Sequence, residues 1–276
     1  ATSWSLKSWR FEQKTKLADY APTLEPFERF ADADVRLQAT ANGIAAANPI
    51  AAGTTVVIDA LDPGSAGAPI FSTDYVEGVR LMIRGRQVRI TGRQSGSRLV
   101  GLALEELVNG QSTYDWQEQA FSSARGYPAS LGFHQNRLVI GGSRGAPDRI
   151  WMSKSGEPFN FDLGTGLDDE AISFRLAADR LHKISSVFTG RQLQVFTGAG
   201  EWVIKGFPLA PGNIQVERQT GIGSYAARRI PPLDVDGATL FVGSTGRDLR
   251  EFLFADTEQA YQAADLALLS RHLMTD

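Results

Sequence analysis

The side chains best suited to catalysis or metal binding are thinly spread along this chain. Its three histidines, His134, His182 and His272, lie far apart in the sequence. A zinc or similar metal site needs several nitrogen, sulfur or carboxylate ligands brought together. We therefore expect these histidines to be core or surface imidazoles, and no metal ligands are predicted.

The densest acidic cluster is Asp168, Asp169 and Glu170. A calcium loop uses oxygen ligands at alternating positions, whereas three adjacent carboxylates point to different sides. A glycosidase needs two carboxylates facing each other across a sugar, and no spacing to Glu201 indicates such a pair. Neither chemistry is predicted here.

Signals for a nucleophile or a bound phosphate are also missing. The chain has no cysteine and no G-x-S-x-G segment. The glycine-rich stretch 141–145 lies between two expected strands and lacks the lysine of a phosphate-binding loop, so it predicts a hairpin turn. The sequence thus predicts no catalytic residue, no cofactor and no metal, and the protein is not expected to be an enzyme.

A run of arginines is the most distinctive charged feature. It comprises Arg84, Arg86, Arg89, Arg93 and Arg98 on one expected hairpin. Such a row could contact phosphates. It could also protect a strand edge or form a subunit interface. We favour edge protection or an interface, because acidic residues outnumber basic ones and the net charge is -3.

The composition is that of an ordinary globular protein. Of 276 residues, 42% are hydrophobic and 21% are charged. No apolar stretch approaches the roughly 20 residues that cross a bilayer, and charges near the start interrupt any signal-peptide core. We expect no membrane anchor.

Three similar strand-turn-strand segments in the second half predict β-hairpins, at 137–153, 192–205 and 239–254. They recur at about 45 to 55 residues, which is typical of β-propeller blades. We expect Leu138, Leu193 and Leu240 to be buried at equivalent positions. The aromatic residues Trp151, Trp202 and Phe252 are expected to face the same core layers.

The predicted fold is mostly β, in three parts. Residues 1–30 form an N-terminal strand and linker. Residues 31–112 form a small β-barrel or sandwich module of short strands. Residues 113–276 form a partial propeller-like domain of β-hairpin blades. This domain ends in one C-terminal helix over 256–274, where apolar residues recur at helical spacing and either Asp256 or Thr257 is the expected N-cap.

Several segments resemble those of phage tail nozzle proteins, the tail tubular proteins of short-tailed phages. Residues 126–138 (GYPASLGFHQNRL) are similar to the family's entry segment, and 150–161 (IWMSKSGEPFNF) to its next motif. Residues 168–174 (DDEAISF) match the acidic run that follows. The β module resembles the insert that is likened to the FCCH domain of ubiquitin-activating enzymes, with no ubiquitin chemistry implied. Family members are usually longer than this chain.

The resemblance implies a structural component of a phage tail. It would line or support the DNA conduit below the portal and act in DNA ejection. Implied partners are further copies in a ring, expected to be a hexamer, other tail and adaptor proteins, and transiently passing DNA. The location would be the virion tail, after assembly in the bacterial host cytoplasm. Candidate interface residues of opposite sign are Arg84, Arg86, Arg89 and Arg93 against Asp168, Asp169 and Glu170.

The alternative function is a carbohydrate- or receptor-binding β protein, like an adhesin of a virion or cell surface. Trp4, Trp9, Trp151 and Trp202 would stack on sugar rings if exposed. A hydrolase on the same scaffold is a third interpretation, and the missing catalytic spacing counts against it.

Overall fold

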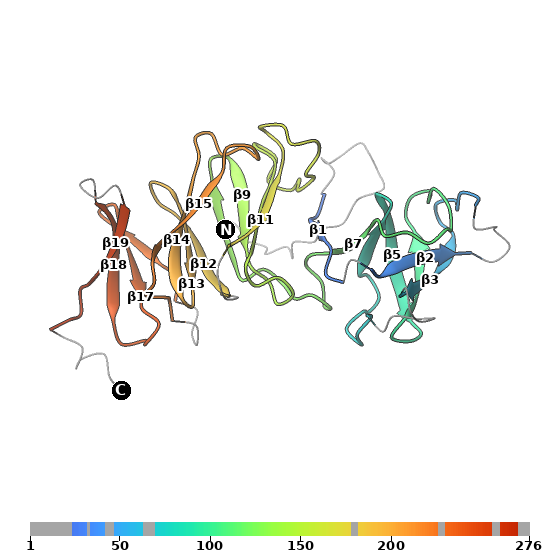
Figure 1. The fold of residues 1–276 in the computed structure, drawn as a ribbon, viewed down its shortest axis with the longest axis horizontal. Helices are drawn as coiled ribbons and strands as arrows, with labels where there is room; N and C mark the ends of the chain where they lie inside the picture. The colour runs from blue at the N-terminus through green and yellow to red at the C-terminus, as the bar shows by residue number, and fades with distance from the viewer. Residues whose placement is uncertain are drawn as a thin grey trace, which may run out of the picture. The chain divides into compact units, whose positions relative to one another are not determined.

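The computed structural model describes residues 24–31, 34–41, 47–62, 70–177, 182–225, 230–255 and 260–269. Every regular element in these ranges is a β-strand, so the predicted mostly β class is confirmed. The strands form four antiparallel sheets, one of seven strands and three of four (Figure 1). None of the described residues belongs to a helix that could cross a bilayer.

The chain divides into two compact units. Unit 1 consists of Ala1–Glu25, Pro128–Gly142 and Pro147–Asp276. Unit 2 consists of Pro26–Tyr127 and the short loop Ser143–Ala146. The predicted boundaries at 30 and 112 remain predictions.

Unit 2 is built on the seven-stranded sheet, in the order β1-β7-β4-β5-β6-β3-β2. Its strands are β1 (Phe27–Glu28), β2 (Arg36–Thr40), β3 (Thr55–Leu61), β4 (Arg80–Ile83), β5 (Arg86–Arg93), β6 (Arg98–Ala103) and β7 (Trp116–Gln119). The strands expected from alternation at 35–40, 55–59, 79–84, 87–91 and 99–104 are all present.

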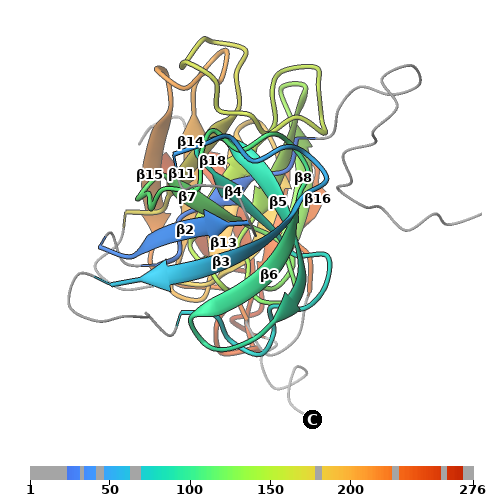
Figure 2. The same cartoon turned by 90° about the vertical axis from the view of Figure 1, so that its right-hand side faces the viewer.

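Burial in unit 2 follows the strand period of two. In β2, β3 and β6 every second side chain is buried, because one face of the sheet packs on the core and the other meets solvent. Figure 2 shows the strands of this sheet curving around one another, with β3 beside β6. An isolated bridge joins Leu37 to Thr113. The sheet is nevertheless not closed, so the expected barrel or sandwich was wrong and a single open sheet replaces it.

Unit 1 contains three four-stranded sheets, each running through its strands in chain order. Sheet A consists of β8 (Ser130–His134), β9 (Arg137–Gly141), β10 (Arg149–Met152) and β11 (Ile172–Arg175). Sheet B consists of β12 (Ile184–Thr189), β13 (Leu193–Thr197), β14 (Gly200–Lys205) and β15 (Gln215–Thr220). Sheet C consists of β16 (Leu233–Val235), β17 (Ala238–Val242), β18 (Leu249–Ala255) and β19 (Ala260–Asp265).

The three predicted hairpins are the central strand pairs of these sheets: β9 with β10, β13 with β14, and β17 with β18. Leu138 and Leu193 are buried as expected, and so are Trp151, Trp202 and Phe252. The expectation for Leu240 was wrong. Leu240 pairs with Glu251, on the opposite face of sheet C from Phe252, and is only half-buried. A shift of one residue changes the face that a strand residue presents.

The sheets of unit 1 share apolar cores. Ile150 and Met152 of sheet A pack in one cluster with Leu193 and Trp202 of sheet B. The other face of sheet B supplies Phe196 and Val203 to a second cluster, which also holds residues of sheet C. Sheet B is therefore covered on both faces.

The predicted C-terminal helix was wrong where the structure describes it. Residues 260–265 form strand β19, paired along β18 from Arg250 to Ala255, and 266–269 form turns. Tyr261 stacks on Phe252 with ring centroids 4.6 Å apart. The open edge of β18 offers a full ladder of hydrogen bonds, which outweighs a weak helical propensity. The rest of the predicted helix, 256–259 and 270–274, lies outside the described residues.

Candidate interface surfaces

The arginine-rich hairpin is formed by β4 and β5 in unit 2. Its turn residues Arg84 and Gly85 have φ angles of 51° and 72°, as the twist of a two-residue hairpin requires. Arg84 is an uncommon residue for this conformation. Its Nη2 lies 3.5 Å from the carbonyl oxygen of Ser112, so its side chain is held near the sheet.

Two further arginines of the row are engaged inside unit 2. The Nε of Arg93 donates to the carbonyl of Phe71 at 3.0 Å. Arg98 contacts both carboxylate oxygens of Asp59, at 2.5 and 3.1 Å, and this bidentate contact raises the pKa of Arg98. These side chains are occupied by their own subunit.

Arg86 and Arg89 are exposed as well, but they differ from the others because the side chain of neither makes a hydrogen bond or ion pair with another described residue. Arg89 stands directly opposite Arg80 across the β4–β5 ladder. Like charges facing each other across a sheet are unfavourable. Arg80 is buried and its guanidinium donates to the side-chain oxygen of Gln87 at 3.4 Å, so Arg89 is the arginine of this pair that faces solvent.

The acidic turn lies in the long connection between β10 and β11 of unit 1. The carboxylate of Glu170 is turned inward. Its Oε2 accepts backbone N–H groups from Thr165, Gly166 and Leu167 at 2.7, 2.5 and 2.8 Å. These bonds, first that of Leu167, lower the pKa of Glu170. A Cβ at Gly164 would overlap this carboxylate, so the loop requires glycine there.

Arg137 fixes the same turn from beneath. Its buried guanidinium donates to the carbonyls of Ser153, Asp168 and Glu170 at 2.7, 2.7 and 2.6 Å. The backbone of the turn is thereby held, while the side chains of Asp168 and Asp169 are exposed. The turn thus presents two exposed carboxylates on a backbone that Arg137 holds in place.

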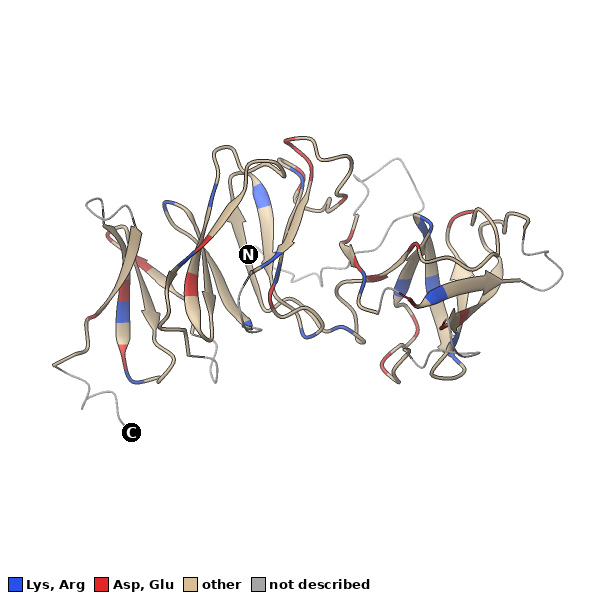
Figure 3. Cartoon of the chain, in the orientation of Figure 1, with Lys and Arg blue, Asp and Glu red and all other residues tan. Residues whose placement is uncertain are grey.

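The structure therefore divides the predicted interface residues into two groups. Arg84, Arg93 and Glu170 bind groups of their own unit. The residues of the second group expose their charged side chains to solvent: Arg86, Arg89, Asp168 and Asp169. The arginines belong to unit 2 and the aspartates to unit 1. Figure 3 shows basic and acidic segments interspersed along the ribbon.

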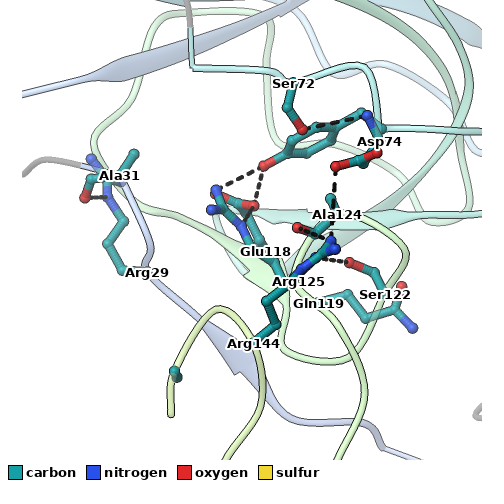
Figure 4. Close-up of polar contacts among 12 residues, drawn as sticks. Arg29, Ala31, Ser72, Asp74, Glu118, Gln119, Ser122, Ala124, Arg125 and Arg144 are labelled. Carbon is teal, nitrogen blue, oxygen red and sulfur yellow. Dashed lines mark hydrogen bonds and ion pairs between the residues drawn. The ribbon is translucent and has the colours of Figure 1, made fainter. Parts of the chain in front are cut away.

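Sequence reasoning missed a buried polar cluster in unit 2. Glu118 receives two bonds from Arg125, both at 2.7 Å, and one from the hydroxyl of Tyr75 (Figure 4). Arg125 also lies over the ring of Phe30. Burial raises the pKa of Tyr75. The available signal was Glu118 itself. It is an acidic residue two positions after Trp116 on β7, on the buried side of the strand, where apolar residues are expected.

Glu201 is a second buried acid, in β14 of sheet B. It is fully buried and accepts a hydrogen bond from the hydroxyl of Thr220. Burial raises the pKa of Glu201, and the backbone amides of Ile222 and Gly223 oppose the rise. This glutamate is enclosed in a sheet covered on both faces, so it has no access to a substrate.

A cavity among the described residues offers little room for a small ligand. It lies in unit 1, has a volume of about 60 Å³, and is lined by Lys183, Ser186 and Ser224 among others. Ligand pockets are usually about 300 Å³ or more. Across the described ranges no three His, Asp or Glu side chains gather as metal ligands. His134 is buried, which lowers its pKa.

The chain matches no known protein-family model and no curated protein.

Proposed function

We propose that this protein is a structural subunit of a phage tail, of the nozzle or tail tubular kind, that lines or supports the DNA conduit and acts in DNA ejection. The observation that carries the proposal is the pair of exposed, opposite charges on firmly held elements. Arg86 and Arg89 lie on β5, and Asp168 and Asp169 lie on a turn fixed by Arg137. A ring needs two different complementary faces on each copy.

The sheets of unit 1 support the same proposal. Each is a four-stranded meander in chain order, and successive sheets share a core. These are features of propeller blades. A propeller needs about four blades to close. The three sheets of unit 1 would therefore be blades of a propeller that they do not close by themselves. The blades supply a stiff frame on which interface loops keep their positions.

The charge distribution suits a wall past which DNA slides. Each phosphate that a protein neutralises adds affinity, so a basic lumen would retain DNA. The net charge of -3 and the interspersed charged segments fit that requirement. The expected setting is a virion tail assembled in the bacterial cytoplasm, with other copies and adaptor proteins as partners.

The carbohydrate- or receptor-binding alternative loses part of its support. Trp151 and Trp202 are 2% and 5% exposed and pack in the cores of unit 1, so neither offers a ring face to a sugar. Trp4 and Trp9 lie outside the described residues. A glycan array with the full chain separates the alternatives, because specific sugar binding would favour the adhesin.

The test of the proposal is charge reversal at the two surfaces. Arg86→Glu with Arg89→Glu should block incorporation into tails and leave Tm nearly unchanged. Asp168→Arg with Asp169→Arg should do the same, and combining the two reversals should restore incorporation. Arg175→Glu with Arg247→Glu is the matched control, since both arginines are exposed in unit 1. Infectious particles built with either reversed surface alone would overturn the pairing.

A further inference from the structure

A small cavity lies in unit 1, where the beginning of sheet B meets the chain segment that leads into sheet C. Sheets B and C lie side by side (Figure 1) and share an apolar core. Phe196 of sheet B and Phe241 of sheet C line the apolar part of the cavity wall. The polar part is lined by Lys183 and Ser186, at the beginning of sheet B, and by Ser224, which lies between β15 and β16.

Three hydrogen-bond donors on this wall have no partner among the described residues. Ser224 is 8% exposed, and its hydroxyl is buried without a hydrogen bond. The side chains of Lys183 and Ser186 make no hydrogen bond or ion pair with another described residue. The neighbouring Ser185 differs, because its hydroxyl donates to the carbonyl of Phe196 at 2.9 Å. A buried donor without a partner is unfavourable, so the cavity calls for an occupant that accepts hydrogen bonds.

The chemistry of the wall favours an anion. None of its described lining residues is an aspartate or a glutamate, so no carboxylate balances the ammonium group of Lys183. Ammonium and hydroxyl groups donate to oxygen acceptors, and the bonds are stronger where one partner is charged. Lys183 is exposed and Ser224 is buried. The donors therefore extend from the solvent, where an ion enters, into the interior.

The segment that carries Ser224 is held in place by its backbone. The amide of Ser224 donates to the carbonyl of Thr197 in β13 at 2.8 Å, which ties the segment to sheet B. The next amide, that of Tyr225, donates to the carbonyl of Val242 in β17 at 3.1 Å, which ties it to sheet C. The hydroxyl of Ser224 is thus positioned before any ligand arrives, and binding requires little ordering of the chain.

The volume of the cavity limits the size of the anion. The cavity measures about 60 Å³. A cavity of about 15 Å³ holds one water molecule, whose share of liquid water is about 30 Å³, so this cavity has room for roughly two to four waters. A tetrahedral oxyanion such as phosphate or sulfate needs a similar space. A sugar or a nucleotide does not fit.

We propose that this cavity binds a small oxyanion of the phosphate or sulfate class, held by Lys183, Ser186 and Ser224. The ion accepts a hydrogen bond from each of these side chains and balances the charge of Lys183. It thereby links the beginning of sheet B to the segment that leads into sheet C. The site does not depend on the proposed tail function, and it uses neither the arginine-rich hairpin nor the acidic turn.

Titration of inorganic phosphate into the full chain, followed by amide NMR, tests the proposal against chloride at equal ionic strength. Phosphate should shift the resonances of 183–186 and 224–225 until they saturate, with a dissociation constant of roughly millimolar, because a small ion makes few contacts. Lys183→Met should weaken binding about tenfold or more, and Ser224→Ala several-fold, since the charge-assisted bond is the stronger one. Lys205→Met is the matched control. It removes the same charge from a residue of unit 1 outside the cavity wall and should leave binding unchanged.

Thermal unfolding gives a second readout, with circular dichroism to show that each variant is folded. Phosphate also stabilises proteins in general because it is excluded from their surface, and that rise in Tm should be the same in every variant. The additional rise from site binding should be smaller in Lys183→Met and absent from Ala129→Leu, which fills the cavity from its wall and keeps all three donors.

Two results would overturn the proposal. One is a set of phosphate-induced shifts no larger than those with chloride, together with an equal rise in Tm in the wild type, Lys183→Met and Ala129→Leu. The other is phosphate binding that Lys205→Met weakens as much as Lys183→Met does, since this would show attraction to net charge rather than to the cavity.

Discussion

Strands β3 and β13 are both mostly apolar but are buried differently. In β3 of unit 2, the valine, isoleucine and alanine at alternate positions are buried and their neighbours are not. In β13 of sheet B all five side chains are buried. The cause lies outside the strands: β3 belongs to a sheet with one core face, and β13 to a sheet between two others.

This difference decides where polar side chains are tolerated. On the solvent face of the large sheet, Gln38 and Asp59 remain partly exposed. In sheet B, Gln194, Thr197 and Glu201 are polar yet at most 2% exposed. Polar groups enclosed between two sheets are costly unless they find partners in the protein. Thr197, for example, donates its hydroxyl to the carbonyl of Gly200. The stability of a sheet that is covered on both faces thus depends on more of its residues.

The largest effect is expected from Trp202→Ala in sheet B. This side chain is 5% exposed in the core shared by sheets A and B, and its removal should cost about 3 to 5 kcal/mol. Val57→Ala, on the solvent face of β3, is the comparison and should cost well under half as much. Urea unfolding followed by fluorescence and circular dichroism measures both. Equal losses would break the contrast between the sheets.

A smaller loss is expected from Glu118→Gln in unit 2. The substitution leaves the guanidinium of Arg125, whose side chain is 23% exposed, without its counter-charge. Removing one partner of a buried pair costs about 3 to 5 kcal/mol, and the partial exposure of Arg125 reduces this to about 2 to 3 kcal/mol. Asp59→Asn breaks the solvent-exposed pair with Arg98 and should change urea stability little. A Glu118→Gln protein as stable as Asp59→Asn would show that the cluster is not important to the fold.

The smallest effects concern two glutamates of unit 1 with opposite pH dependence. The raised pKa of Glu201 means that stability falls as pH rises from its unfolded value, about 4.3, through its folded value. The lowered pKa of Glu170 means that stability is present above about pH 4.3 and is lost as pH falls through its folded value.

Glu201→Gln and Glu170→Gln separate these contributions. Urea midpoints between about pH 3 and pH 7 should decline less with rising pH in Glu201→Gln than in the wild type. In Glu170→Gln they should gain less over the same rise. Identical pH profiles for the two variants would contradict the assignment of Glu201 to a buried site and Glu170 to a backbone nest.

The hairpins could be predicted because their signal is local. Glycine turns and β-branched or aromatic strands mark β9–β10 and β13–β14 in the sequence alone. The strand near the C-terminus could not be predicted, because Tyr261 and Ala264 fit the apolar face of a helix equally well. Only the pairing with β18 selects the strand. A neighbouring strand that offers a ladder of hydrogen bonds overrides the intrinsic helix propensity of a segment.

The candidate surfaces were predictable as charge patterns but not as contacts. The sequence shows that Arg84 and Glu170 belong to charged runs. It does not show that Arg84 turns toward Ser112 or that Glu170 binds three amides of its own loop. Both outcomes depend on backbone geometry at positions such as Gly85 and Gly164, where the chain adopts positive φ. The exposure of Arg86 and Asp168 can be known only once the positions of these neighbouring residues are known.

The loop Ser143–Ala146 has a consequence for how the protein is made. It is part of unit 2, where Arg144 donates to the carbonyl of Ser123 at 2.6 Å and Ala146 is fully buried. A ribosome releases the chain from its N-terminus, so β8 and β9 leave the exit tunnel before this loop does. Unit 2 therefore cannot finish folding on the nascent chain until the first two strands of sheet A have been synthesised.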